Sequence, residues 1–155
     1  MSSKNKDNNN NFYGNEISSQ DLISLNLLTL QLKGILLNYF GNSLLWNSTI
    51  QGIQHVLEKY DSIEGNEHDS NLTPDLIALQ SYYISLVAKI ISLYIAFTRY
   101  NVVSEMKVNG DFNFSLQPNI YINTANVLNI IVSYYYIRAL QGIILDRDIQ
   151  PIFGI

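Results

Sequence analysis

Three long stretches of this chain contain no acidic residue, and each of them is strongly apolar. They run over residues 22–57, 76–104 and 112–145. The cations near their middles are Lys33, Lys89 and Arg138. Charged residues make up 14% of the whole chain, against roughly 25% in an ordinary soluble domain. Because such segments make poor water-facing surfaces, we expect much of each to be covered by the chain itself, by copies of it or by lipid.

Composition excludes several classes of partner and chemistry. The nine basic residues are scattered and the net charge is −4, whereas nucleic-acid binding depends on clustered Lys and Arg that displace counterions from phosphates. The same scatter argues against simple adhesion to an anionic lipid surface. The chain has no cysteine, which removes disulfides, thiolate nucleophiles and Cys-ligated metals. Its polar start lacks a signal peptide, so we expect an intracellular protein, with membrane association left open.

The first half of the chain predicts a polar arm followed by two helices. Residues 1–18 lack the apolar content to repay ordering and are expected to form a flexible arm. Ser18 or Ser19 can cap a helix that continues to about residue 40. We expect Gly41-Asn42 to break it and a second helix to cover about residues 44–60. Residues 61–72 then form an acidic, turn-rich connector.

The second half predicts two more helices separated by a β-hairpin. Thr73 is a good N-cap before Pro74, so a third helix should begin there and continue to about residue 100. Apolar residues alternate with polar ones over residues 102–122, and Asn109-Gly110 is a strong hairpin-turn signal. A last helix is expected over about residues 123–145.

The predicted fold is therefore mainly α. It is an antiparallel bundle of about four helices, with a small β-hairpin insertion between the third and the fourth. Residues 19–148 form a single helical domain, and residues 149–155 form an apolar C-terminal tail.

Candidate catalytic and metal-binding groups are few. His55 and Glu58 share a helix face at a spacing of three, which could supply two metal ligands, but such a pair is far more often a surface hydrogen bond. The connector carries four closely spaced ligand-type residues without the alternation of a calcium loop, so a solvated acidic turn is favoured. They are Glu64, Glu67, His68 and Asp69. We therefore expect no enzymatic activity, no cofactor and no small-molecule substrate.

The cations within the apolar runs allow two interpretations. In a bilayer centre Lys89 or Arg138 would each cost about 2.5–3.5 kcal/mol, which is tolerated when the cation faces a partner or a pore. Small residues at Ala88, Ser92 and Ala96 would also let helices approach closely in a membrane. In a soluble bundle, Lys89 and Arg99 would instead mark the water-facing stripe of an amphipathic helix. We favour the soluble interpretation because the stripe is regular and Tyr and Ser are abundant.

Aromatic and apolar residues near the C-terminus predict an interface, because three consecutive tyrosines on a helix point in three directions and an apolar tail is expected to dock. The candidate contact residues are Tyr134, Tyr135, Tyr136, Ile152, Phe153 and Ile155. The primary hypothesis is a non-enzymatic structural protein that binds copies of itself or another protein. The alternative is a small membrane protein whose helices at 76–100 and 124–145 insert as a pair, as a pore or a scaffold. A third is a helical bundle that binds a small ligand in a Tyr-lined apolar cavity.

Overall fold

The described part of the protein consists of three long helices. The computed structural model describes residues 18–61, 73–110 and 114–145. Helix α1 spans Ser19–Asp61, α2 spans Thr73–Val108 and α3 spans Gln117–Leu145. With a rise of 1.5 Å per residue, the helices are about 64, 54 and 44 Å long. Each is far longer than the three or four turns of an average globular helix.

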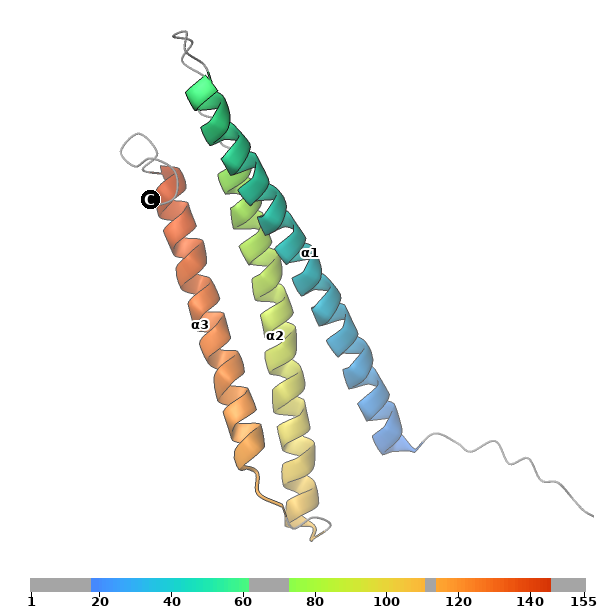
Figure 1. Cartoon of the computed structure of the whole chain (residues 1–155). Coiled ribbons are helices and arrows are strands. Elements are labelled where there is room, and N and C mark those ends of the chain that lie inside the picture. The colour runs from blue at the N-terminus through green and yellow to red at the C-terminus, as the bar shows by residue number, and fades with distance from the viewer. Residues whose placement is uncertain (1–17, 62–72, 111–113, 146–155) are drawn as a thin grey trace, which may run out of the picture.

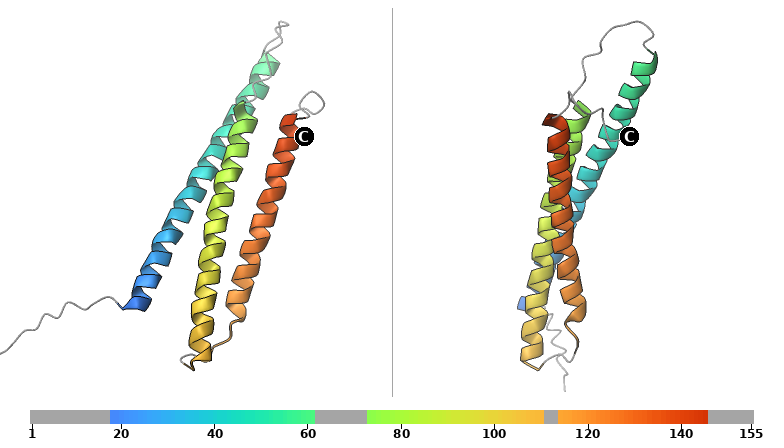
Figure 2. Two further views of the ribbon diagram at one scale, coloured as in Figure 1. Left: turned by 180° about the vertical axis from the view of Figure 1, so that it is seen from behind. Right: turned by 90° about the vertical axis from the view of Figure 1, so that its left-hand side faces the viewer.

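The three helices run antiparallel, with α2 between the other two (Figure 1). α2 packs against both α1 and α3, whereas no backbone contact joins α1 to α3 in the described part of the chain. The two further views show that α1 is tilted relative to α2, while α3 runs more nearly along it (Figure 2). The arrangement leaves much of each helix outside any helix–helix contact.

The predicted capping signals are found at the helix ends. The Ser18 hydroxyl accepts a hydrogen bond from the Asp21 backbone N–H at 3.1 Å and donates one to the Asp21 carboxylate at 2.7 Å, so Ser18 caps α1. α2 begins at Thr73, as predicted, with Asp75 in its first turn. α2 ends at a turn in which Gly110 has a φ of +82°, a conformation that glycine adopts without a steric penalty.

Two predictions about the elements are wrong, and both concern residues read as breaks. Gly41-Asn42 does not interrupt α1, so the two helices expected at 19–40 and 44–60 are one. The hairpin expected over 102–122 is also wrong: α2 continues to Val108, α3 begins at Gln117, and no residue described between them forms a strand. Asn109-Gly110 is a turn, but it closes a helix. The all-helical, antiparallel class is confirmed, with three helices in place of four and a hairpin.

The lengths of the apolar runs match one another once the helices are aligned. Ser48 of α1 donates a hydrogen bond to the Pro74 carbonyl at the start of α2, at 2.6 Å, so α1 continues about three turns beyond that level. The runs that lie side by side are residues 22–48, 76–104 and 120–145. They measure about 39–44 Å at 1.5 Å per residue, close to the roughly 40–45 Å of a bilayer with its headgroup regions.

Candidate functional site: the polar interior of the helix layer

α1 faces α2 with a row of buried residues that recur every seven positions. The row consists of Leu27, Gly34, Gly41 and Ser48. A repeat of seven keeps one side of a helix against its partner in a left-handed supercoil. Three of the four residues are small, so the two backbones can approach closely.

Gly41 lies at a close approach between α1 and α2. A Cβ atom built on Gly41 would lie 2.7 Å from the Ser85 hydroxyl oxygen and 3.0 Å from the Ser81 backbone carbonyl oxygen. A Cβ on Gly34 would lie 3.2 Å from a methyl carbon of Ile91, a side-chain atom that can move slightly. The residue interpreted as a helix break is therefore the residue that permits contact.

α3 faces α2 with a row whose spacing alternates between three and four. The row consists of Asn123, Asn126, Ile130, Ser133, Ile137, Leu140 and Ile144, all buried or half-buried. Opposite it, the rings of Tyr82 and Tyr136 stack with centroids 5.1 Å apart and an interplanar angle of 21°. The α2–α3 contact thus uses larger side chains than the contact between α1 and α2.

Lys89 of α2 and Arg138 of α3 donate hydrogen bonds to neutral oxygens. The Lys89 ammonium donates to the Ser133 hydroxyl at 2.5 Å, and that hydroxyl donates in turn to the Asn129 carbonyl at 2.8 Å. Arg138 donates to the side-chain oxygen of Gln141 at 3.0 Å. The Gln141 amide in turn donates to the Tyr83 hydroxyl at 2.8 Å. Lys89 and the Gln141–Tyr83 pair therefore join α2 to α3 through polar contacts.

Burial in the described helices is inverted relative to a water-soluble bundle. The buried polar residues are Ser48, Asp75, Ser81, Ser85, Asn123 and Ser133. The buried apolar residues are Leu27, Ala78, Ala88, Ile95, Ala96, Ile137 and Leu140, three of them alanine. Only 11–22% of the most apolar stretch of each helix is buried. Small and polar side chains thus fill much of the interior, whereas a soluble protein buries its large apolar ones.

The large apolar side chains point outward on all three helices. On α2 they recur at alternate spacings of three and four as Tyr83, Val87, Ile90, Tyr94 and Phe97, with 44–60% of each exposed. On α1 the row at helical spacing is Leu25, Leu28, Leu32, Leu36 and Tyr39, with 52–73% exposed. These are the rows that amphipathic analysis of a soluble helix assigns to the core.

The α2 stripe, interpreted as water-facing, is exposed at Arg99 and half-buried at Lys89, but most of its small residues are buried. Ser81 is 2% exposed and Ala88 is 3% exposed, because this side of α2 lies against α1. Lys89 is half-buried against α3. Sequence periodicity located the stripe correctly, but periodicity gives no sign of which side faces the solvent.

The predicted interface tyrosines of α3 separate into two environments. Tyr134 and Tyr135 are 55% and 68% exposed, and their rings meet edge to face with centroids 5.8 Å apart. Tyr136 is half-exposed and stacks on Tyr82 of α2. The other three candidates, Ile152, Phe153 and Ile155, lie outside the described residues, as do the polar arm at 1–17 and most of the acidic connector.

The described residues contain no group of three or more His, Asp or Glu side chains placed to hold a metal ion. His55 and Glu58 both lie on the part of α1 beyond the start of α2. Glu64, Glu67, His68 and Asp69 fall in the segment that the structure does not describe.

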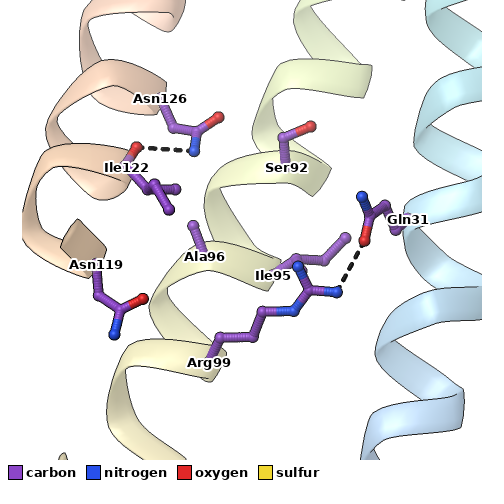
Figure 3. Close-up of a pocket in the computed structure, with 8 residues that line it drawn as sticks. All are labelled: Gln31, Ser92, Ile95, Ala96, Arg99, Asn119, Ile122 and Asn126. Atoms are coloured by element: carbon purple, nitrogen blue, oxygen red, sulfur yellow. Dashed lines mark hydrogen bonds between the residues drawn. The ribbon is translucent and has the colours of Figure 1, made fainter. Parts of the chain in front are cut away.

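A hollow of about 180 Å³ opens over α2 near its C-terminal end (Figure 3). Its lining residues are Gln31 of α1, Ser92, Ile95, Ala96 and Arg99 of α2, and Asn119, Ile122 and Asn126 of α3. Arg99 reaches toward α1, where its guanidinium donates to the Gln31 side-chain oxygen at 2.8 Å. Small residues at Ser92 and Ala96 leave the space, and no tyrosine lines it. Sequence analysis missed this site because its residues come from three helices.

All three helices are long and apolar enough to cross a membrane, by length and composition. No protein-family model, curated protein or solved structure matches the chain. The class that the geometry defines is thus a three-helix antiparallel layer in which small and polar residues share the interior with a few apolar ones and in which many large apolar side chains are exposed.

Proposed function

We propose that the protein is a non-enzymatic integral membrane protein, a scaffold whose three helices cross the bilayer side by side. The observation that carries the proposal is the inverted burial: small and polar residues between the helices and large apolar residues outside. In lipid, helices associate through close packing of small residues and through interhelical hydrogen bonds, because tails and apolar side chains are equally apolar. The Gly34–Gly41–Ser48 row and the Lys89–Ser133 contact are features of these two kinds.

The position of Lys89 supports the same proposal. Lys89 lies 14 residues from Asp75 and 10 from Arg99, within the middle part of the apolar run of α2. A lysine facing hydrocarbon there would cost about 2.5–3.5 kcal/mol. Its side chain is instead half-buried and donates to Ser133 of the next helix. If the outer surface of the helices faced water, the Lys89 side chain could point outward and would not need this contact.

The chain offers a direct test, because it contains no cysteine. Single cysteines introduced as Gln20→Cys and Val108→Cys report one end of the layer, and Tyr60→Cys and Leu145→Cys report the other. In sealed vesicles, a membrane-impermeant maleimide should label the two pairs from opposite sides. Val87→Cys, on the outer face of α2, should stay unlabelled until detergent is added. Labelling of Val87→Cys in intact vesicles, or recovery of the native chain in the soluble fraction, would contradict the proposal.

Self-assembly is a second candidate function, favoured by the outer face of α3. Tyr121, Leu128, Val132 and Tyr135 are 49–68% exposed along one side of this helix, and no described helix covers them. Tyrosine gives large contact area at low entropic cost and is enriched at interfaces. Light scattering in mild detergent should show a particle of more than one chain. Tyr135→Ala should reduce its mass, whereas Tyr94→Ala, the matched change on α2, should not.

A further inference from the structure

We infer that the hollow around Arg99 binds the phosphate group of an anionic ligand. The eight residues that line it include one cation and no carboxylate. Arg99 presents a planar group with five N–H donors, of which the contact to Gln31 uses one end. Guanidinium groups recognise phosphate oxygens through charge-assisted, often paired, hydrogen bonds.

The remaining lining side chains are suited to a small polar group. Ser92, Asn119 and Asn126 bring hydroxyl and amide groups from two helices to the same space (Figure 3). The Ser92 hydroxyl donates to the Ala88 carbonyl at 3.1 Å and one N–H of the Asn126 amide donates to the Ile122 carbonyl at 2.9 Å, which leaves the Asn119 amide and the second N–H of Asn126 as the available donors. A volume of about 180 Å³ is below the roughly 300–1,000 Å³ of pockets for drug-sized ligands. The hollow therefore accommodates a headgroup or a small anion, and not a large organic molecule.

The first turn of α3 adds a weaker electrostatic attraction for anions. α3 begins at Gln117, whose backbone N–H donates to the Ser115 hydroxyl at 3.2 Å, and Asn119 lies in this first turn. The N-terminus of a helix carries a partial positive charge that favours anions.

A carboxylate occurs nearby as well: Asp21 lines an adjoining hollow of about 490 Å³ that shares Arg99 and Asn119. The Asp21 carboxylate accepts a hydrogen bond from the Ser18 hydroxyl at the start of α1.

The adjoining hollow makes a phospholipid the source that we propose. Its lining includes apolar side chains from α1 and α2, among them Leu27, Leu28, Val102, Val103 and Met106. Arg99 lies nine residues from Ile90, the middle residue of the apolar outer row of α2, or about 14 Å along the helix. Half of the hydrocarbon core of a bilayer is about 15 Å, so the backbone of Arg99 would lie near the edge of that core, from which a long arginine side chain can extend to the lipid phosphates. This choice of source rests on the proposed membrane location, whereas the phosphate chemistry does not.

The test uses the purified full chain in a phosphate-free detergent. Phosphatidylglycerol is titrated against diacylglycerol, which has the same chains without the phosphate, and bound lipid is counted by native mass spectrometry. Arg99→Gln removes the guanidinium, and Arg138→Gln is the control, since it removes one charge outside the hollow. We expect phosphatidylglycerol to bind the native chain and the Arg138→Gln variant alike, and to bind Arg99→Gln about tenfold more weakly or worse. Diacylglycerol should bind none of them selectively.

Competition with inorganic phosphate and glycerol phosphate distinguishes the two possible sources of the phosphate group, a phospholipid and a free phosphate compound. If inorganic phosphate or glycerol phosphate displaces the lipid from the native chain but does not displace the lipid that Arg99→Gln still binds, the site recognises free phosphate compounds. The phosphate inference then stands. Should the chain prove soluble, the same titration in detergent-free buffer keeps the inference testable apart from the proposed function. Asn119→Ala provides a second variant in case Arg99→Gln fails to fold, with helix content by circular dichroism as the check. Equal binding of phosphatidylglycerol by Arg99→Gln, Asn119→Ala and Arg138→Gln would overturn the inference.

Discussion

α2 makes two interfaces of different construction, one with α1 and one with α3. Against α1 it presents serine and alanine to glycine, so the contact depends on backbones that lie close together. Against α3 it uses a stacked tyrosine pair and a lysine that reaches a serine hydroxyl. The first interface leaves no room for an added atom at Gly41, whereas the second depends on particular groups that can be removed. The two should therefore respond to opposite kinds of substitution.

Enlarging Gly41 should produce the largest effect. In Gly41→Leu the new Cβ must lie within about 3 Å of the Ser85 hydroxyl oxygen and the Ser81 carbonyl oxygen, so α1 must move away from α2. We expect a loss of about 3 kcal/mol or more in the free energy of unfolding, at or above the upper end for overpacking. Equilibrium unfolding in mixed micelles measures it. An unchanged stability would show that α1 and α2 are not in close contact.

Removing the hydroxyl of Ser133 should weaken the other interface by less. Ser133 is fully buried, and Ser133→Ala deprives the Lys89 ammonium of its acceptor in the contact between α2 and α3. Leaving a buried donor without its partner costs about 1–3 kcal/mol, and because Lys89 is only half-buried we expect a loss at the lower end of this range. The control is Thr98→Ala, because the Thr98 hydroxyl bonds only to the Tyr94 carbonyl of its own helix on an exposed face. If both variants lose the same stability, the Lys89 contact contributes nothing.

Replacing one ring of the stacked pair tests the aromatic part of the α2–α3 interface. Tyr82→Leu keeps an apolar side chain but removes the stacking on Tyr136. We expect a loss of about 0.5–1.5 kcal/mol and no change in helix content by circular dichroism. Tyr94→Leu, on the outer face of α2, should leave the unfolding free energy within about 0.5 kcal/mol of the native value.

Enlarging Gly52 should produce the smallest change in the free energy of unfolding, and a change of opposite sign to that at Gly41. A Cβ on Gly52 would meet no atom within 4 Å, and glycine in a helix costs stability relative to alanine. Gly52→Ala should therefore raise the stability by about 0.4–1 kcal/mol. A loss in this variant would place an unseen contact on the part of α1 that projects past the start of α2.

The sequence predicted helix positions well wherever a capping signal was local. Ser18 and Thr73-Pro74 mark helix starts that depend on residues within one turn, and both predictions hold. Gly41 was misread because its role depends on Ser81 and Ser85, forty or more residues away. Glycine destabilises an isolated helix. It is nevertheless retained within a helix where a neighbouring helix packs too closely for any side chain.

The stripe of small and polar residues on α2 was predicted from the sequence, but the side to which such a row faces cannot be read from spacing. The row containing Leu25, Leu28 and Leu32 and the stripe containing Ser81 and Ala88 both follow from helical spacing. Assigning the first to the core assumes water outside, and the structure places it on the outer surface. The hollow at Arg99 could not be predicted, because Gln31, Arg99 and Asn119 are brought together only by the alignment of three helices.

The central position of α2 also has a consequence for the order in which the protein assembles. α1 and α2 are consecutive in the chain and bury the Gly34–Gly41–Ser48 row between themselves, without any contribution from α3. During synthesis this pair can reach its final arrangement before the last helix has left the ribosome. α3 then adds to a finished template, so variants confined to its inner row should detach the third helix and leave the first two joined.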